Sequence, residues 1–168
     1  MSSLYKFTLN KSILAVMTVA VAGGLSSACS GADTRYDVPD EVRNFPALGM
    51  KGPVTAAKLP TPTHDDLIEG AAVWDSNCRV CHGAGIAGAP KITNGNNWNK
   101  RLGQDIEVIF DHAINGFQPY AGGNMPPKGG NTSLSDEEVK NAVRYMLFNS
   151  GGADMVIENL KTKDQSEG

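Results

Sequence analysis

Two cysteines and a histidine stand together near the middle of this 168-residue sequence. The stretch CRVCH places Cys78 and Cys81 three positions apart, and His82 follows the second cysteine directly. Two thiols and an imidazole at this spacing can form a disulfide, bind a metal, act as a redox dithiol or hold a haem covalently. These four possibilities make different demands on the rest of the chain.

Three of the four fit the chain poorly. Zinc needs further ligands, but the other histidines, His64 and His112, are 48 residues apart and no second cysteine pair exists. A thioredoxin-like dithiol expects a preceding strand, and a disulfide across so short a loop would order little of the chain. Covalent haem attachment explains the spacing, because the two cysteines add to neighbouring vinyl groups while the adjacent histidine reaches the iron. Haem c is therefore the favoured interpretation.

A first helix is predicted to run into CRVCH. Leu67, Ala71, Trp74 and Cys78 recur at helical spacing. Its predicted start is a capping box in which Thr63 is the N-cap residue and Asp66 stands three positions on.

Two further helices are predicted downstream. One spans roughly Gln104–Ile114 and ends where Asn115 and Gly116 follow. The clearest begins at Ser135, which can form a capping box with Glu138, and shows one continuous apolar face over residues 139–147. No convincing strand appears, so the expected fold class is all-α.

The predicted domain, residues 64–150, has little to fill its centre. Between its helices lie two loops of about 20 residues, which is long for so small a domain unless something organises them. Large apolar side chains are also few for a self-sufficient core. Both features agree with a bound haem at the centre of the domain.

Residues 1–28 are predicted to be an export signal. Lys6 and Lys11 precede an apolar stretch over residues 13–25, which is too short to span a bilayer comfortably. A retained membrane-anchor helix is the alternative. Removal of the signal leaves 13 basic and 18 acidic residues, a net charge of −5. An acidic product without a basic run argues against nucleic acid as a partner.

Cys29 follows small residues in GLSSACSG, as in bacterial lipoprotein signals, in which this cysteine becomes the mature N-terminus and carries acyl chains. Ser26 stands where leucine is usual, so ordinary cleavage after Ala28 is the alternative. Residues 29–63 are rich in proline, lack an apolar period and are predicted to be a free tether; a strap packed on the domain around residues 45–50 is the alternative. Residues 151–168 are predicted to be a tail that is disordered or holds a short helix.

Several motifs together resemble the class I c-type cytochromes. They are a helix ending in CRVCH, a glycine-rich loop reaching Pro90, the run GNMPPKGG and a closing amphipathic helix. The most similar group is the small bacterial c5 cytochromes, over residues 67–148. The resemblance implies three main helices and long loops wrapped around one covalent haem. Many c5 cytochromes carry a second cysteine pair after the methionine loop, where this chain has GGNTSLS.

The resemblance also implies roles for individual residues. His82 would be the proximal iron ligand, its ring oriented by the carbonyl of Pro90. Met125, in a loop braced by two prolines, would be the distal ligand. Trp98 and Arg101 would contact the haem propionates; for Trp98 the alternative is a core residue without such a contact.

The same resemblance predicts how the first and last helices meet. Gly70 would be the small residue where they cross, with Tyr145 facing it. Trp74 would pack in the same interface.

An iron with six ligands leaves no position open for a substrate, so the expected function is one-electron transfer rather than catalysis. The expected partners are redox proteins, such as membrane dehydrogenase or oxidase complexes, with no small-molecule substrate. The expected location is the periplasmic side of a membrane, held by the lipid on Cys29. The alternatives are a permanent electron-transfer subunit of such a complex, or a five-coordinate haem that senses a gas or reduces peroxide.

Overall fold

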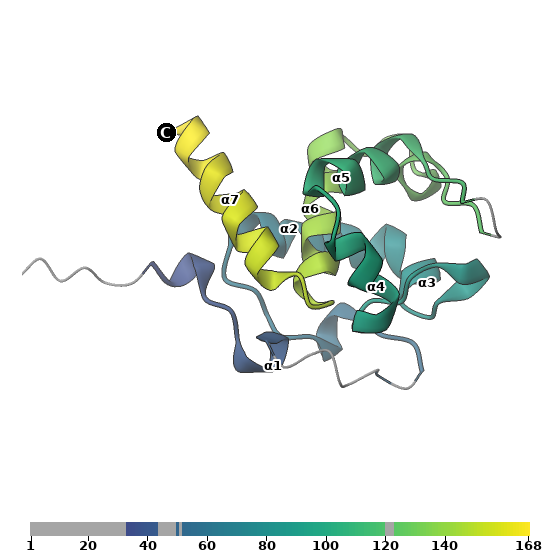
Figure 1. Cartoon of the computed structure of the whole chain (residues 1–168), viewed down its shortest axis with the longest axis horizontal. Coiled ribbons are helices and arrows are strands. Elements are labelled where there is room, and N and C mark those ends of the chain that lie inside the picture. The colour runs from purple at the N-terminus through teal and green to yellow at the C-terminus, as the bar shows by residue number, and fades with distance from the viewer. Residues whose placement is uncertain (1–32, 44–49, 51, 120–122) are drawn as a thin grey trace, which may run out of the picture. The chain divides into compact units, whose positions relative to one another are not determined.

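The computed structural model describes residues 33–43, 50, 52–119 and 123–168, and this part of the chain is helical (Figure 1). The predictions for the export signal and for Cys29 lie outside the described residues. Strand-like pairing within the described residues is limited to an isolated antiparallel bridge between Phe117 and Met125. The predicted all-α class is confirmed.

The three predicted main helices are present as α2, Asp65–Val73, α5, Ile106–Asn115, and α6, Asp136–Phe148. A wider π-helical turn, η4, Trp74–Cys78, and the short helix α3, Arg79–His82, follow α2 without a break. The haem-type motif therefore lies at the end of one continuous helical run.

The caps of α2 and α6 test two predictions. Ser135 and Glu138 form the predicted capping box at α6. The predicted N-cap of α2, Thr63, is wrong, because His64 takes that position and its Nδ1 accepts the backbone N–H of Asp66 at 3.2 Å. The Thr63 hydroxyl instead donates to the carbonyl of Arg35.

The remaining helical elements are short, except for two. They are η1, Thr34–Tyr36; α1, Asp40–Arg43; η3, Ala56–Lys58; η5, Ile86–Gly88; α4, Gly95–Leu102; η6, Pro127–Gly130; and α7, Ala153–Glu167. Helix α4 lies inside the segment predicted to be loop. Its pattern is weak because six of its eight residues are Gly, Asn, Lys or Arg, and buried Trp98 anchors it.

The predicted C-terminal tail is a 15-residue helix, α7, packed on the domain. Four residues at helical spacing, Ala153, Val156, Ile157 and Leu160, are buried. Lys163 adds ion pairs to Asp66 at 2.7 Å and to Glu137 at 3.0 Å, which connect α7 to α2 and α6. The polar residues between the buried positions obscured this period in the sequence.

The predicted free tether is also wrong for the described residues between 33 and 63. Val42, Val54 and Leu59 are buried in the core, although no period marks them in the sequence. The Tyr36 hydroxyl donates to the carboxylate of Asp164 on α7 at 2.7 Å. We call Met50 together with residues 52–62 the strap.

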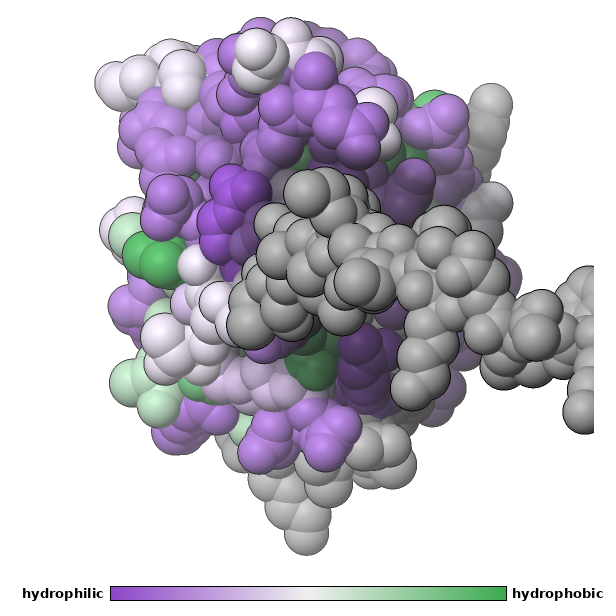
Figure 2. Space-filling view, turned by 90° about the vertical axis from the view of Figure 1, so that its left-hand side faces the viewer, coloured by the Kyte–Doolittle hydropathy of each residue, from purple (hydrophilic) through white to green (hydrophobic). Residues whose placement is uncertain are grey.

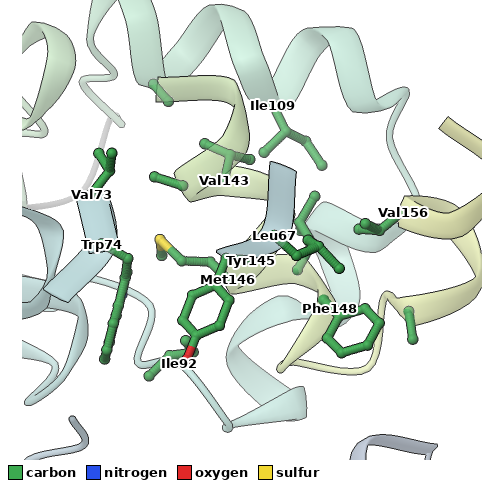
Figure 3. Packing of buried hydrophobic residues seen from close by; sticks show 14 of the residues in the cluster. Leu67, Val73, Trp74, Ile92, Ile109, Val143, Tyr145, Met146, Phe148 and Val156 are labelled. Carbon is green, nitrogen blue, oxygen red and sulfur yellow. The ribbon is translucent and has the colours of Figure 1, made fainter. Parts of the chain in front are cut away.

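The core forms where α2 and η4 meet α6 (Figure 3). The rings of Trp74 and Tyr145 lie with their centroids 5.7 Å apart, so the prediction that Trp74 packs in this interface is confirmed. Leu67, Val143 and Met146 fill the space beside them, and Val156 brings α7 into the same cluster.

Gly70 lies where α2 crosses α6, as predicted. A Cβ atom at this position would stand 2.1 Å from the backbone oxygen of Asn141 and 3.2 Å from the backbone nitrogen of Ala142. The backbone opposite Gly70 is thus that of Asn141 and Ala142. Tyr145 follows one turn further along α6, where its ring packs against Trp74.

Replacing Gly70 by alanine should destabilise the fold by about 3 kcal/mol, because α2 and α6 would have to move apart. Gly103→Ala is a matched control, because a Cβ there meets its nearest atom only at 3.9 Å and its φ is −86°. The control should change the free energy of unfolding by about 0.5 kcal/mol or less. Chemical denaturation of both variants measures the difference, and equal midpoints would contradict the close crossing.

The side of the domain that carries α7 is mostly hydrophilic, with small separate apolar areas (Figure 2).

Within the described residues, no helix is both long and apolar enough to cross a bilayer.

Candidate haem centre

The two cysteines and the histidine of CRVCH lie on one side of a helical turn. Cys78 ends η4, while Cys81 and His82 belong to α3, and residues three and four positions apart on a helix share a face. Both cysteines are free thiols. Burial raises the pKa of the Cys78 thiol to about 11, whereas Cys81 is exposed. Two unpaired thiols therefore stand beside one imidazole, where a single ligand can meet all three.

His82 is held in the orientation that a metal ligand needs. Its side chain is buried, and Nδ1 lies 2.9 Å from the carbonyl oxygen of Pro90, as predicted. Because a carbonyl only accepts, Nδ1 carries the proton and the lone pair of Nε2 is free. Burial also lowers the pKa of His82, which favours the neutral ring.

A second hydrogen bond joins the same two segments. The backbone N–H of Ile92 donates to the carbonyl of His82 at 2.8 Å. The loop after η5 is therefore connected to both the ring and the backbone of His82.

Met125 lies in a loop that is connected to the haem-type motif. Its backbone exchanges two hydrogen bonds of 2.9 Å with Phe117, and its side chain is half-buried against the core. Asn77, directly before Cys78, donates from Nδ2 to the carbonyl of Lys128 at 3.1 Å. Asn77 thus connects the end of η4 to η6, which follows Met125. Sequence reasoning missed Asn77, because a polar residue inside a helical pattern carries no distinguishing signal.

Trp98 and Arg101 lie together on α4, the helix that sequence reasoning missed. The Trp98 Nε1–H donates to the carbonyl of Lys91 at 2.9 Å. The indole has no second donor, so Trp98 is a buried residue that supports the loop of Lys91, in agreement with the alternative of a core residue. Its predicted contact with a haem propionate stays a prediction.

Arg101 lies on the same helix, and its predicted contact with a haem propionate stays a prediction. Its guanidinium lies 5.8 Å from the centre of the Trp98 ring and donates to the carbonyl of Asn97 at 2.6 Å. Partial burial lowers the pKa of Arg101, and its charge contributes to the lowered pKa of His82. A partly buried cation close to His82 is suited to a carboxylate supplied by a ligand.

The donor set fits a covalently held haem. Two free thiols can form thioether bonds, and the free Nε2 of His82 can bind iron. Zinc fits less well, since the described residues contain no group of three or more His, Cys, Asp or Glu side chains arranged to hold a metal.

Comparisons with known proteins agree with this centre. The family described as cytochrome c oxidase, cbb3-type, subunit III matches residues 65–146. Cytochrome c-555 of Prosthecochloris aestuarii is 44% identical over 85 residues, which cover 49% of this chain and 86% of the relative. Cytochrome c-555 of Chlorobaculum tepidum is 39% identical over 85 residues, covering 51% and 78%. Cytochrome c5 of Ectopseudomonas mendocina is 38% identical over 72 residues, covering 42% and 77%.

The fold, the donor set and these relatives together define a haem protein of the cytochrome c type. The chain belongs to the class I c-type cytochromes and is similar to cytochromes c-555 and c5. It binds one haem c covalently and acts as a monohaem electron carrier. The predicted family, fold, cofactor and general function are confirmed, and the family agrees with an exported protein.

Proposed function

We propose that this cytochrome passes single electrons between redox proteins with His82 and Met125 as the two axial ligands of its haem iron. The observation that carries the proposal is the 2.9 Å contact between His82 Nδ1 and the Pro90 carbonyl, which leaves Nε2 free for iron. Cys78 and Cys81 hold the haem through thioether bonds, and Arg101 pairs with a propionate. The bound haem supplies a reversible Fe(III)/Fe(II) couple.

With both axial positions filled by side chains, the protein carries electrons rather than catalysing a reaction. Residues 80–90 contain no Asp, Glu, Lys or Arg, and Val80 and Ile86 are exposed at 65% and 53%. An uncharged surface beside the cysteine-bearing helix suits brief contacts with redox partners, which are of the low-area, rapidly released kind.

A second candidate is a permanent electron-transfer subunit of a membrane oxidase. Its support is the matched family and a more distant relative, the cbb3-type cytochrome c oxidase subunit FixP of Bradyrhizobium diazoefficiens. That relative is 29% identical over 133 residues, which cover only 46% of its length. The size of the protein in native extract separates the two: a free carrier elutes alone, and a subunit elutes with its complex.

The proposal includes export through residues 1–28 and a lipid on Cys29. Only residues 30–32 lie between Cys29 and Asp33, where the described fold begins. A chain across these positions reaches at most about 14 Å. The lipid would hold the domain against the membrane. The free tether predicted for residues 29–63 does not fit the packed strap.

Cys29→Ala should move the protein from the membrane fraction to the soluble periplasm, because stable anchoring depends on the acyl chains. The ratio of membrane-bound to soluble protein should fall by about tenfold or more. The one-electron midpoint potential should stay the same, since Cys29 lies outside the haem-binding domain. Fractionation, N-terminal mass and a potentiometric titration test both parts. Wild-type protein that is soluble and carries no acyl mass would refute the proposed lipid anchor. A potentiometric titration that does not follow a one-electron curve would refute the proposed role as a one-electron carrier.

A further inference from the structure

We propose that the strap and Lys91 act as a positioning device that holds the His82 ring on the Pro90 carbonyl. This inference rests on the proposed role of His82 as an iron ligand. It assigns a function to Met50 and residues 52–62, which lie before the residues that the family model matches, 65–146.

The strap holds the chain directly after His82. The backbone N–H of Val54 donates to the carbonyl of Gly83 at 3.0 Å, and the Val54 side chain is fully buried. A Cβ on Gly83 would come within 2.9 Å of the Val54 carbonyl oxygen, so a glycine is needed for this approach. Gly83, the residue directly after His82, therefore lies against the strap.

The strap also holds the chain directly after Pro90. The Lys91 ammonium donates to the carbonyl of Gly52 at 2.8 Å and to that of Met50. The carbonyl of Lys91 itself accepts the Trp98 indole N–H. Lys91 is thus fixed from the strap through its side chain and from α4 through its backbone.

Together these contacts enclose the hydrogen bond between His82 and Pro90. Gly83 follows the donor of that bond and Lys91 follows its acceptor, and both are bonded to the same short strap. The rest of the strap is fixed along the haem-type helix, where the N–H of Ala56 donates to the Asp75 carboxylate at 3.2 Å. Asp75 is in turn paired with Arg79 at 3.0 Å.

This arrangement matters because the partner of the second ring nitrogen determines the orientation and basicity of a metal-bound histidine. Charge-assisted bonds from an ammonium to carbonyls are stronger than neutral ones. Loss of the Lys91 contacts should therefore allow the loop of Pro90 to open more often, and water should reach the Nδ1 proton of His82.

The test compares Lys91→Met with two control variants, each in the full-length haem-loaded protein. Lys91→Arg keeps the charge and the donors. Lys58→Met removes an ammonium that, among the described residues, bonds the strap's own Pro53 carbonyl at 3.2 Å. NMR of the ferrous protein measures solvent exchange of the His82 Nδ1 proton. Because local opening controls the exchange of the Nδ1 proton, we expect it to be about tenfold faster in Lys91→Met than in wild type. In the two control variants the exchange rate should stay within about twofold of wild type.

Two outcomes would overturn the proposal. One is an unchanged Nδ1 exchange rate in Lys91→Met; the other is faster exchange matched by equally faster exchange of core amides, which reports general destabilisation. If Lys91→Met does not accumulate, Val54→Ala removes buried contact from the strap and should speed Nδ1 exchange in the same selective way. Failure of the proposed ligation is recognised separately, because the His82 ring protons of the wild-type protein would then lack the shifts of an iron ligand.

Discussion

Replacing Cys78 and Cys81 together by serine should abolish covalent haem attachment and leave a largely unfolded chain. Serine hydroxyls do not add to vinyl groups, so neither thioether bond can form. The helices α2, α5 and α6 would then lack the group around which the loops are organised. Intact mass under denaturing conditions should fall by one haem relative to wild type, and far-ultraviolet circular dichroism should lose most of its helical signal.

The single variants serve as controls for this result. Cys78→Ser and Cys81→Ser each keep one thiol, and each should retain haem through one thioether bond at reduced yield. Cys29→Ala should retain haem fully, because Cys29 lies outside the haem-binding domain. Wild-type haem that extracts freely into acidic organic solvent would refute covalent attachment at these residues.

Replacing Met125 by alanine should open the iron to external ligands and lower the midpoint potential. A methionine sulfur favours the ferrous state, so its loss favours the ferric state. The backbone pairing of Met125 with Phe117 does not depend on the side chain, so the loop should keep its course. Carbon monoxide should bind the ferrous variant stoichiometrically, and a potentiometric titration should show the lower potential.

Met155→Ala is the matched control, because Met155 lies on α7 and is also half-buried against the core. It should leave both the potential and carbon monoxide binding as in wild type. If Met125→Ala behaves like Met155→Ala, Met125 is not an axial ligand. A five-coordinate sensor or peroxidase would then become the better interpretation of the centre.

The main helices could be predicted because their signals are local. The apolar faces of α5 and α6 recur with helical period, and the capping box of Ser135 and Glu138 marks the start of α6. The N-cap of α2 was misassigned because Thr63 and His64 are adjacent candidates. Only the folded chain shows that the His64 ring accepts the N–H of Asp66 while the Thr63 hydroxyl turns to Arg35.

The strap could not be predicted, because its contacts are not periodic. Val54 and Leu59 are single apolar residues among prolines and small residues, yet both are buried in the core. The bond from Lys91 to Gly52 spans 39 positions and uses a backbone carbonyl, which has no signature in the sequence. Composition alone therefore indicated a free tether where the chain is packed.

Some parts of the candidate haem site could also be predicted from the sequence, and others could not. The CRVCH motif and the Pro90 partner of His82 follow from short spacings and a family resemblance, and the structure has the hydrogen bond. The hydrogen bond from the Trp98 indole N–H to the Lys91 carbonyl depends on how α4 folds back on the loop, and no local pattern encodes this. The ring contact of Tyr145 with Trp74 depends on the axial register of two crossing helices, which their full side-chain packing determines.

If His82 and Met125 fill both axial positions of the haem iron, the optical spectrum of the wild-type protein must show it. We expect a low-spin ferric spectrum with the weak sulfur-to-iron charge-transfer band of methionine ligation, and a ferrous spectrum that carbon monoxide does not change. A high-spin ferric spectrum, or immediate binding of carbon monoxide by the ferrous protein, would contradict it.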